Sequence, residues 1–385
     1  MRPAPIYIEA FGLACALGPD AASISRNLFA VGPPSAPPRE FLIDGRDVPV
    51  GRLSFELQSR AGETRTNCLL AHCFAQIAQE VAAARARFGA QRLAIVLGAC
   101  TTGIAEAGEA MAYRHARGDW PAGFKLQAQQ LDDGAWFLAN LAKIEGPTYS
   151  ISTACTSGAR ALAAGARLLR AGLCDAVLCG GADSLSPLTL NGFAALESLS
   201  QSACNPMSAH RDGIHIGEAG ALFLLTRAPG PYRLSLWGES ADSYQISPPD
   251  PSGAGAERAL RGALAKAGLT QKDIGFVHMH GTATRLNDAM EAAVLHRVFG
   301  EDLPCASTKP LTGHTLGTAG ALQAAFCIMA LREGRLPPHH WDGVRDPALP
   351  SIRLVGSAES WAGHHALSAS YAFGGNNCAL VISRE

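Results

Sequence analysis

Cys155 is the residue of this chain best placed to act as a nucleophile. It follows the β-rich segment TYSIST and opens an alanine-rich segment that is typical of a helix. A thiol at a helix N-terminus lies near unpaired N–H groups and the positive end of the helix dipole, and both favour the thiolate. Small neighbouring residues would let a substrate approach the sulfur. We therefore expect nucleophilic catalysis by Cys155, with a buried, inert cysteine as the alternative.

Two histidines occupy comparable positions in the second half of the chain. His280 ends the segment IGFVHMH, and His314 lies in TGHTLGTAG ahead of a long apolar segment. Polar groups at strand–helix junctions can leave the core and face a cleft, so we expect both imidazoles to share a site with Cys155. His278 is a competitor, because residues two apart on a strand point the same way. Loop-like sequence predicts solvated or turn roles for His339–His340 and His364–His365.

A lysine and a glycine pair lie close to these histidines in the sequence. Lys309 precedes His314 by five residues in apolar surroundings. A buried lysine needs a carboxylate, and Glu291 is a plausible partner, whereas a surface lysine is the alternative. The segment FGGNN at 373–377 carries glycines that let a backbone N–H approach a ligand closely, although a tight turn between core strands would also explain them.

An alternation of strands and helices must position these residues. Strands are expected at 6–15, 92–100, 147–153, 175–185, 217–227 and 274–281, at the start of 305–336, and twice within 365–385. Helices are expected at 67–87, 154–173 and 257–269 and in the rest of 305–336, and residues 105–145 mix helix and loop. This strand–helix–strand order predicts a layered α/β architecture.

The two halves of the chain resemble each other. The segment 152–173 parallels 307–334, since each has Ser-Thr, a reactive type of residue, a glycine and an alanine-rich helix. We infer an internal duplication, with halves at 1–230 and 231–385. Helices this apolar on all sides are expected to lie between two sheets, which predicts five layers, α-β-α-β-α.

Composition excludes several classes of function. The chain has 385 residues, 48% of them apolar, and a net charge of −1, which argues against a disordered chain and against a nucleic-acid binder. The 11 cysteines are irregularly spaced, without a C-x2-C pair, so we expect free thiols in the cytoplasm rather than disulfides or a zinc site. No segment is apolar enough to predict a membrane span, and no P-loop or G-x-S-x-G motif occurs.

Four segments together resemble the signatures of β-ketoacyl-acyl-carrier-protein synthases of the I/II type, which belong to the thiolase superfamily. They are STACTSGA around Cys155, HGTATRLND from His280, STKPLTGHTLGTAG around Lys309 and His314, and AFGGNN at 372–377. Their order and spacing match the family over essentially the whole chain. The resemblance implies the duplicated thiolase fold and a Cys-His-His site. The short chain is most similar to the ketosynthases of bacterial aryl-polyene and xanthomonadin-type pigment clusters.

The activity that the resemblance implies is a decarboxylative Claisen condensation. Cys155 would take an acyl group from the phosphopantetheine arm of an acyl-carrier protein. His280 and His314 would stabilise the enolate formed when malonyl-carrier protein loses carbon dioxide, and the chain of a fatty acid, polyene or polyketide would be elongated. No metal or organic cofactor is implied. The partners implied are the carrier protein and an identical or paralogous subunit that completes a dimer.

Further roles are implied residue by residue. The N–H groups of Cys155 and Phe373 would form an oxyanion hole. Phe373 would also act as a gate that Gly374 and Gly375 allow to move. Thr282 and Thr284 would bind the pantetheine arm, the Lys309–Glu291 ion pair would position the histidines, and Asn377 would support the site.

The chain departs from the family pattern at two positions, and three alternative functions compete. Ala283 replaces the more usual Gly or Ser, and Ile214 stands where many members have a phenylalanine in the acyl pocket, which leaves the preferred acyl chain open. A non-elongating partner subunit like a chain-length factor would usually lack Cys155. A degradative thiolase would need a second reactive cysteine near the C-terminus, where Cys378 lies in a strand-like segment. A type III ketosynthase would have asparagine in place of His314.

Overall fold

A single mixed sheet of eleven strands runs through the protein, and its two halves follow the same path. The computed structural model describes residues 4–30, 32 and 34–385. The strand order is β12-β11-β10-β13-β14-β9-β1-β8-β6-β4-β5. The first half contains β1 (Ile6–Ala14), β4 (Leu93–Gly98), β5 (Thr148–Ile151), β6 (Ala176–Asp183) and β8 (Ala219–Thr226). The second contains β9 (Tyr232–Ala241), β10 (Phe276–His278), β11 (Pro304–Ala306), β13 (His365–Ala372) and β14 (Asn376–Arg384), with β12 (Arg353–Leu354) at its edge.

This strand order confirms the duplicated thiolase-type architecture. The order β5-β4-β6-β8-β1 on one side corresponds strand for strand to β11-β10-β13-β14-β9 on the other. The strands β5-β4-β6 in the first half and β11-β10-β13 in the second are parallel, and β12 adds a further parallel strand beside β11. The other pairings in both halves are antiparallel. The boundary at 230/231 stays a prediction. It falls between the end of β8 at Thr226 and the start of β9 at Tyr232.

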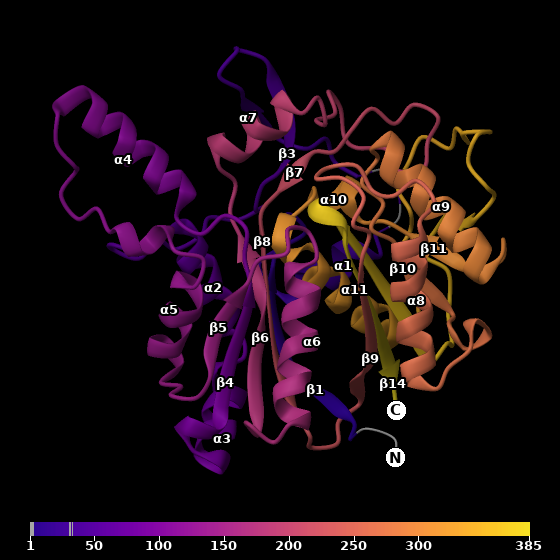
Figure 1. Cartoon of the computed structure of the whole chain (residues 1–385), viewed down its shortest axis with the longest axis horizontal. Coiled ribbons are helices and arrows are strands. Elements are labelled where there is room, and N and C mark those ends of the chain that lie inside the picture. Colours follow the sequence, from indigo (N-terminus) through magenta and orange to yellow (C-terminus); the bar gives the residue numbers. More distant parts are fainter. Residues whose placement is uncertain (1–3, 31, 33) are drawn as a thin grey trace.

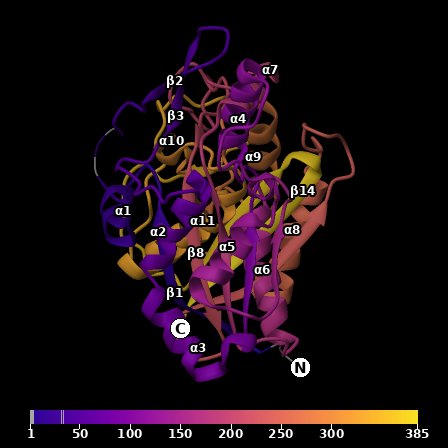
Figure 2. The same ribbon diagram turned by 90° about the vertical axis from the view of Figure 1, so that its left-hand side faces the viewer.

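Two buried helices form the middle layer between the two halves of the sheet (Figures 1 and 2). Helix α6 (Ser157–Arg170) packs on β4 and β6, α11 (Ala319–Glu333) packs on β13 and β14, and the two helices pack against each other. Every residue of α11 from Ala319 to Leu331 is buried. The outer layers are α2 (Arg65–Ala75), α3 (Ala78–Phe88) and α5 (Asp133–Ala142) on one side, and α8 (Ala254–Ala267) and α9 (Arg285–Phe299) on the other. The five predicted layers are therefore present.

Two glycines allow α6 and α11 to cross closely at their first turns. A Cβ on Gly158 would lie 2.8 Å from the Gly317 carbonyl oxygen, and a Cβ on Gly320 would lie 2.7 Å from the Ala159 Cβ. Both distances are shorter than real Cβ contacts, so any side chain would push the helices apart. Because the site residues precede these two turns, the crossing sets how far apart they lie.

The remaining elements surround this framework. They are α1 (Ala21–Leu28), α4 (Ile104–Arg117), α7 (Pro187–Ala195) and the short α10 (Lys309–Thr312). A small three-stranded sheet contains β2 (Arg39–Phe41), β3 (Asp47–Gly51) and β7 (Ile216–Gly217). The 3₁₀ turns are η1 (Ala90–Arg92), η2 (Leu126–Gln129), η3 (Gln271–Asp273), η4 (Leu316–Thr318) and η5 (Phe373–Gly375). Helix α4 projects from the body of the protein in Figure 1. None of the helices in the described residues is long and apolar enough to cross a membrane.

Three expectations about the elements were wrong or incomplete. The two sheets expected on either side of the middle layer are one continuous sheet, because β1 pairs with β9 at Ile6–Leu234 and Tyr7–Arg233. The helix expected at 67–87 breaks after α2, where the Gln76 side chain accepts a hydrogen bond from Leu13 N and donates to Leu13 O. The sequence also did not predict β9, which joins the halves, or α9, whose buried polar face lacks the apolar periodicity of a core helix.

We predict that Gly98→Ala will lower the free energy of unfolding by about 1–3 kcal/mol. The added Cβ would lie 2.3 Å from the Ser157 carbonyl carbon, where α6 begins. Gly108→Ala is the matched control, because Gly108 lies in α4 with open space around it and should gain about 0.5–1 kcal/mol of helix propensity. Denaturant unfolding would measure both. Equal stability of Gly98→Ala and the wild type would contradict close packing of α6 on β4.

Candidate active site

The predicted site residues meet where the parallel strands of the two halves end. Cys155 follows β5, His280 follows β10, His314 follows β11, and Phe373 follows β13. The carboxyl ends of parallel strands form one edge of a sheet, which is where α/β proteins place their ligands. The duplication brings the two edges together. The Sγ and ring nitrogen atoms of Cys155, His280 and His314 lie within 4.8 Å of one another.

A strained turn presents Cys155 to this space. Ala154 has φ 51°, a left-handed conformation that L-residues rarely adopt. The Ser157 hydroxyl holds the turn, because it donates to Ala154 O at 2.6 Å and accepts from Thr153 N at 2.9 Å. Helix α6 begins at Ser157, so the thiol lies just before its first turn, as expected.

His314 contacts the thiol directly. Its Nε2 lies 2.9 Å from Cys155 Sγ, across a separation of 159 residues. The backbone of His314 is held on both sides by the segment leading into β7, since its N–H donates to His215 O at 2.7 Å and its carbonyl accepts from Gly217 N at 2.9 Å. This geometry lets the imidazole take the thiol proton.

His280 is braced through its backbone rather than its ring. Glu291, on α9, accepts from His280 N at 2.7 Å and from Gly281 N at 2.6 Å. The Lys309 ammonium donates to the His280 carbonyl oxygen. Among the described residues, Lys309 forms no ion pair with Glu291, so the expected direct pairing was wrong. Lys309 instead binds the carbonyl, and Glu291 the N–H, of the one peptide unit that joins His280 and Gly281.

Burial sets the protonation states of the trio. It raises the pKa of the Cys155 thiol to about 11, although Lys309 and the N–H groups of Cys155 and Phe373 lower it. It also lowers the pKa of His280 and of His314 well below the usual histidine value, and Lys309 lowers both further. Burial therefore opposes the thiolate that the helix terminus was expected to favour. The directions of the three pKa shifts favour a neutral thiol and two neutral imidazoles in the resting site.

A cavity of about 430 Å³ opens onto the trio. Its lining includes Ile214, Thr282, Thr284 and Phe373, so all four lie where the sequence placed them. The Thr282 and Thr284 hydroxyls are 3.0 Å apart. The Phe373 ring stacks on Phe193 at a centroid distance of 5.8 Å, which places an aromatic pair beside the sulfur.

The FGGNN segment has the backbone geometry that its glycines suggested. Gly374 and Gly375 have φ values of 78° and 70°. Gly374 N donates to Ile246 O at 2.6 Å, and Gly375 O accepts from Asp242 N at 2.8 Å. Asn377 donates to Asp242 Oδ1 at 2.7 Å and to Gly375 O at 3.3 Å, so its side chain supports this turn from behind.

Several competing residues lie outside the cavity. His278 is buried and its Nε2 lies 3.1 Å from the Thr308 hydroxyl, which makes it a core residue. His339 is also buried, between Ser307 N and Pro206 O, which excludes the solvated role, one of the two roles expected for it. Cys378 lies in the middle of the sheet, and burial raises its pKa to about 12. None of the 11 cysteines is paired, as expected, and ten of them are buried.

Comparisons with known proteins agree with this geometry. The chain matches the protein-family models described as "Beta-ketoacyl synthase, N-terminal domain" over residues 66–229 and "Beta-ketoacyl synthase, C-terminal domain" over residues 234–341. A chain of the solved complex of the ketosynthase ApeO with its chain length factor ApeC, from Xenorhabdus doucetiae, is 40% identical, with a TM-score of 0.93, and the match covers 99% of this chain and 98% of that chain. This chain belongs to the β-ketoacyl synthase family.

Curated relatives match over a smaller region. The 3-oxoacyl-[acyl-carrier-protein] synthase 2 of Rhizobium meliloti (strain 1021) is 35% identical over 263 residues, which cover 63% of this chain and 62% of the relative. The enzyme of the same name from Vibrio cholerae serotype O1 is 33% identical over 272 residues, which cover 64% of each. These matches span less than two thirds of the relatives' length. A β-ketoacyl synthase from Burkholderia phymatum STM815 shares the fold, at 23% identity and a TM-score of 0.86 over 99% of each chain.

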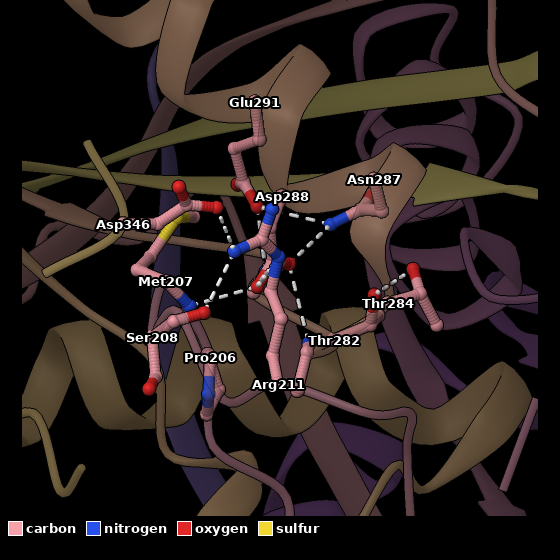
Figure 3. A network of polar contacts seen from close by, with 12 residues as sticks. Pro206, Met207, Ser208, Arg211, Thr282, Thr284, Asn287, Asp288, Glu291 and Asp346 are labelled. Atoms are coloured by element: carbon pink, nitrogen blue, oxygen red, sulfur yellow. Dashed lines mark hydrogen bonds and ion pairs between the residues drawn. The ribbon is translucent and has the colours of Figure 1, made fainter. Parts of the chain in front are cut away.

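A buried polar network that the sequence did not predict lies beside Thr282 and Thr284 in this β-ketoacyl synthase (Figure 3). Asp288, on α9, accepts from Met207 N at 2.8 Å and from Ala283 N at 3.2 Å, two residues with positive φ. Arg211 lies beside it and donates to Asp346 at 2.6 Å. The spacing of Asp288 and Glu291, one helical turn apart, was a usable signal, because two buried acids on one face require donors.

We predict that alkylation of Cys155 by iodoacetamide will rise about tenfold per pH unit between about pH 6 and pH 9. The raised pKa leaves the thiol protonated throughout this range, so the reactive thiolate fraction keeps growing with pH. Mass spectrometry of the peptide containing Cys155 would measure the rate, with Cys155→Ala as the control. A plateau near neutral pH would indicate a preformed thiolate–imidazolium pair and contradict the neutral trio.

Proposed function

We propose that this β-ketoacyl synthase condenses an acyl group held on Cys155 with malonyl-acyl-carrier protein. The observation that carries the proposal is the contact of 2.9 Å between Cys155 Sγ and His314 Nε2, inside a cavity that His280 also lines. A thiol that can give its proton to a neutral imidazole is a competent nucleophile for a thioester. The reaction would elongate a fatty acid, polyene or polyketide chain.

The first stage is acyl transfer to the enzyme. As the thioester approaches, the proton of Cys155 moves to His314 and the sulfur attacks the carbonyl carbon. The N–H groups of Cys155 and Phe373 face the reacting atoms, since both lower the pKa of the thiol. They would donate to the oxyanion of the tetrahedral intermediate. The carrier-protein thiol then leaves and takes up the proton.

The second stage uses both imidazoles as hydrogen-bond donors. The His280 and His314 rings pack edge to face at a centroid distance of 5.3 Å, so both can reach one oxygen. They would stabilise the enolate oxygen of the malonyl thioester as carbon dioxide leaves. The resulting carbanion would attack the acyl carbon and form the new C–C bond, the bond from that carbon to Cys155 Sγ would break, and the released thiolate would take up a proton from solvent. Neutral imidazoles suit this role because their N–H is a much weaker acid than that of imidazolium, so they can donate hydrogen bonds to the enolate oxygen without protonating it.

The cavity wall supports delivery of the substrate on a pantetheine arm. Thr282 and Thr284 would hydrogen-bond its amides, and Phe373, with Gly374 and Gly375, would act as the gate beside the sulfur. Ile214 lines the cavity, belongs to an apolar cluster that includes Leu190 and Leu199, and would limit the acyl chain. We propose that no metal or organic cofactor takes part, because the residues present supply each proton transfer.

We propose that the protein works as a dimer and receives its substrates from an acyl-carrier protein. The edge strand β5 is only half-buried along its whole length, so it can pair with a second chain. Large apolar side chains are also exposed on the segment from α4 to α5, at Met111, Leu126, Leu131 and Trp136. The match to the complex of ApeO and ApeC favours a paralogous partner over an identical one. Free thiols and the absence of disulfides favour the cytoplasm.

A non-elongating partner subunit is the second candidate function, since the matching complex contains a chain length factor. The complete trio argues against it. A subunit that does no chemistry has no need for a strained turn at Ala154 or for a buried lysine beside His280.

We predict that incubation with acyl-loaded carrier protein will add the acyl mass to the peptide containing Cys155. Cys155→Ala should lose the label, and Cys378→Ala, a control at a buried cysteine outside the cavity, should keep it. Mass spectrometry of the digested protein would locate the label. A label on Cys100 or Cys378 would disprove the assignment, and elongation that survives in Cys155→Ala would support the partner-subunit function.

We predict that His280→Ala and His314→Ala will separate the two stages. Both should lose malonyl decarboxylation by about 10²-fold or more, because each removes one donor to the enolate. Only His314→Ala should also slow acylation, although some should remain, because only His314 contacts the sulfur. Single-turnover acylation and release of carbon dioxide would be measured separately. Equal loss of both steps in His280→Ala would contradict this division.

A further inference from the structure

Asp183 is a buried carboxylate for which the proposed chemistry has no use. It ends β6 and is fully buried. No Lys, Arg or His of the described chain forms an ion pair with it. Burial of a charge without a counter-ion is costly unless several hydrogen-bond donors replace the lost water. Asp183 has five such donors, which is the largest number that any side chain near the cavity collects.

The two oxygens of Asp183 serve different halves of the protein. Oδ1 accepts from Cys100 N and Thr101 N, both at 2.8 Å, and from the Thr101 hydroxyl at 3.0 Å. Oδ2 accepts from Thr318 N at 2.9 Å and from its hydroxyl at 3.1 Å. Cys100 and Thr101 follow β4 in the first half, whereas Thr318 immediately precedes α11 in the second. One carboxylate therefore joins the two halves.

One side of this bridge lies next to the turn that holds Cys155, and the other lies close in sequence to His314. Cys100 Sγ lies 3.5 Å from the carbonyl oxygen of Ala154, the strained residue before Cys155. Thr318 follows His314 by four residues, through the turn η4. The carboxylate also lies at the positive end of α11, whose first turn it stabilises.

The bridge lies among backbone conformations that need outside support. Thr102, Ala154 and Leu316 have φ values of 43°, 51° and 48°. Each is a strained conformation that persists only where surrounding groups determine it. Gly317 fits against the carboxylate, since a Cβ there would lie 2.8 Å from Asp183 Oδ2. Burial raises the pKa of Asp183 to about 6, and its donors lower it, so the group is ionised at pH 8.

We propose that Asp183 is a positioning residue that sets the spacing between Cys155 and His314 by tying the segment after β4 to the first turn of α11. The inference rests on the proposed function only in taking Cys155 and His314 as the acting pair. Asp183 itself touches no reacting atom.

Asp183→Asn tests the bridge with almost no change in volume. The NH2 of the new amide would face backbone N–H or hydroxyl groups that now donate to the carboxylate, and so would lose those hydrogen bonds. We therefore expect Cys155 and His314 to move apart and the alkylation of Cys155 by iodoacetamide at pH 8 to slow about tenfold. Asp175→Asn is the matched control, because Asp175 lies just before the other end of β6, where it pairs with Arg92 and Arg227 at the surface. Its alkylation rate should equal that of the wild type.

The direction of the change separates positioning from other roles. Loss of a nearby negative charge alone would favour the thiolate and speed alkylation, and this result would overturn the proposal. A lower melting temperature with an unchanged alkylation rate would indicate a merely structural residue and would overturn it as well. Acyl labelling of wild-type Cys155 is a separate measurement, so failure of the bridge and failure of the proposed function can be told apart.

A second pair of variants decides the outcome if Asp183→Asn does not fold. Thr318→Val removes one hydrogen bond to Oδ2, and Thr318→Ser keeps it. We expect alkylation to be about threefold slower in Thr318→Val than in Thr318→Ser. Equal rates in the two folded variants would overturn the proposal.

Discussion

The close crossing of α6 and α11 is the constraint on which the rest of this structure depends. Gly158 and Gly320 occupy matching positions in the first turns of the two helices, and neither has room for a Cβ. Because Cys155 and His314 lie just before these turns, the crossing brings a sulfur and a ring nitrogen from opposite halves to 2.9 Å. The sheets on the two sides of these helices form one continuous sheet, because β1 pairs with β9.

Desolvation is the second physical theme of the site. A helix terminus alone would favour a thiolate, yet the buried surroundings of Cys155 raise its pKa to about 11. The same burial keeps both imidazoles neutral. The protein also buries three charged side chains near the site, and each contacts backbone groups of the active-site segments. They are Glu291, Lys309 and Asp183. Buried charge here holds the backbone in strained conformations rather than acting on a substrate.

Much of the architecture was predictable because the duplication repeats local patterns. The strands that precede Cys155 and His280 and the helices α6 and α11 have clear apolar patterns, and their glycines and small residues mark the junctions. Helix α9 was not predicted, because its buried face carries the polar residues Asn287, Asp288 and Glu291. Their burial depends on hydrogen-bond donors from other segments. The break between α2 and α3 was not predicted for a similar reason: it depends on hydrogen bonds between the Gln76 side chain and the backbone of β1, which is distant in sequence.

The sequence by itself determined which chemical groups are present, which family they belong to, and that each site residue follows a strand. These properties depend on residues adjacent in the chain. The tertiary structure alone decided that Lys309 binds a carbonyl oxygen rather than Glu291, that the thiol rests protonated, and that Asp183 bridges the halves. Each of these depends on groups far apart in sequence, whose distances and burial exist only once both halves have packed around α6 and α11.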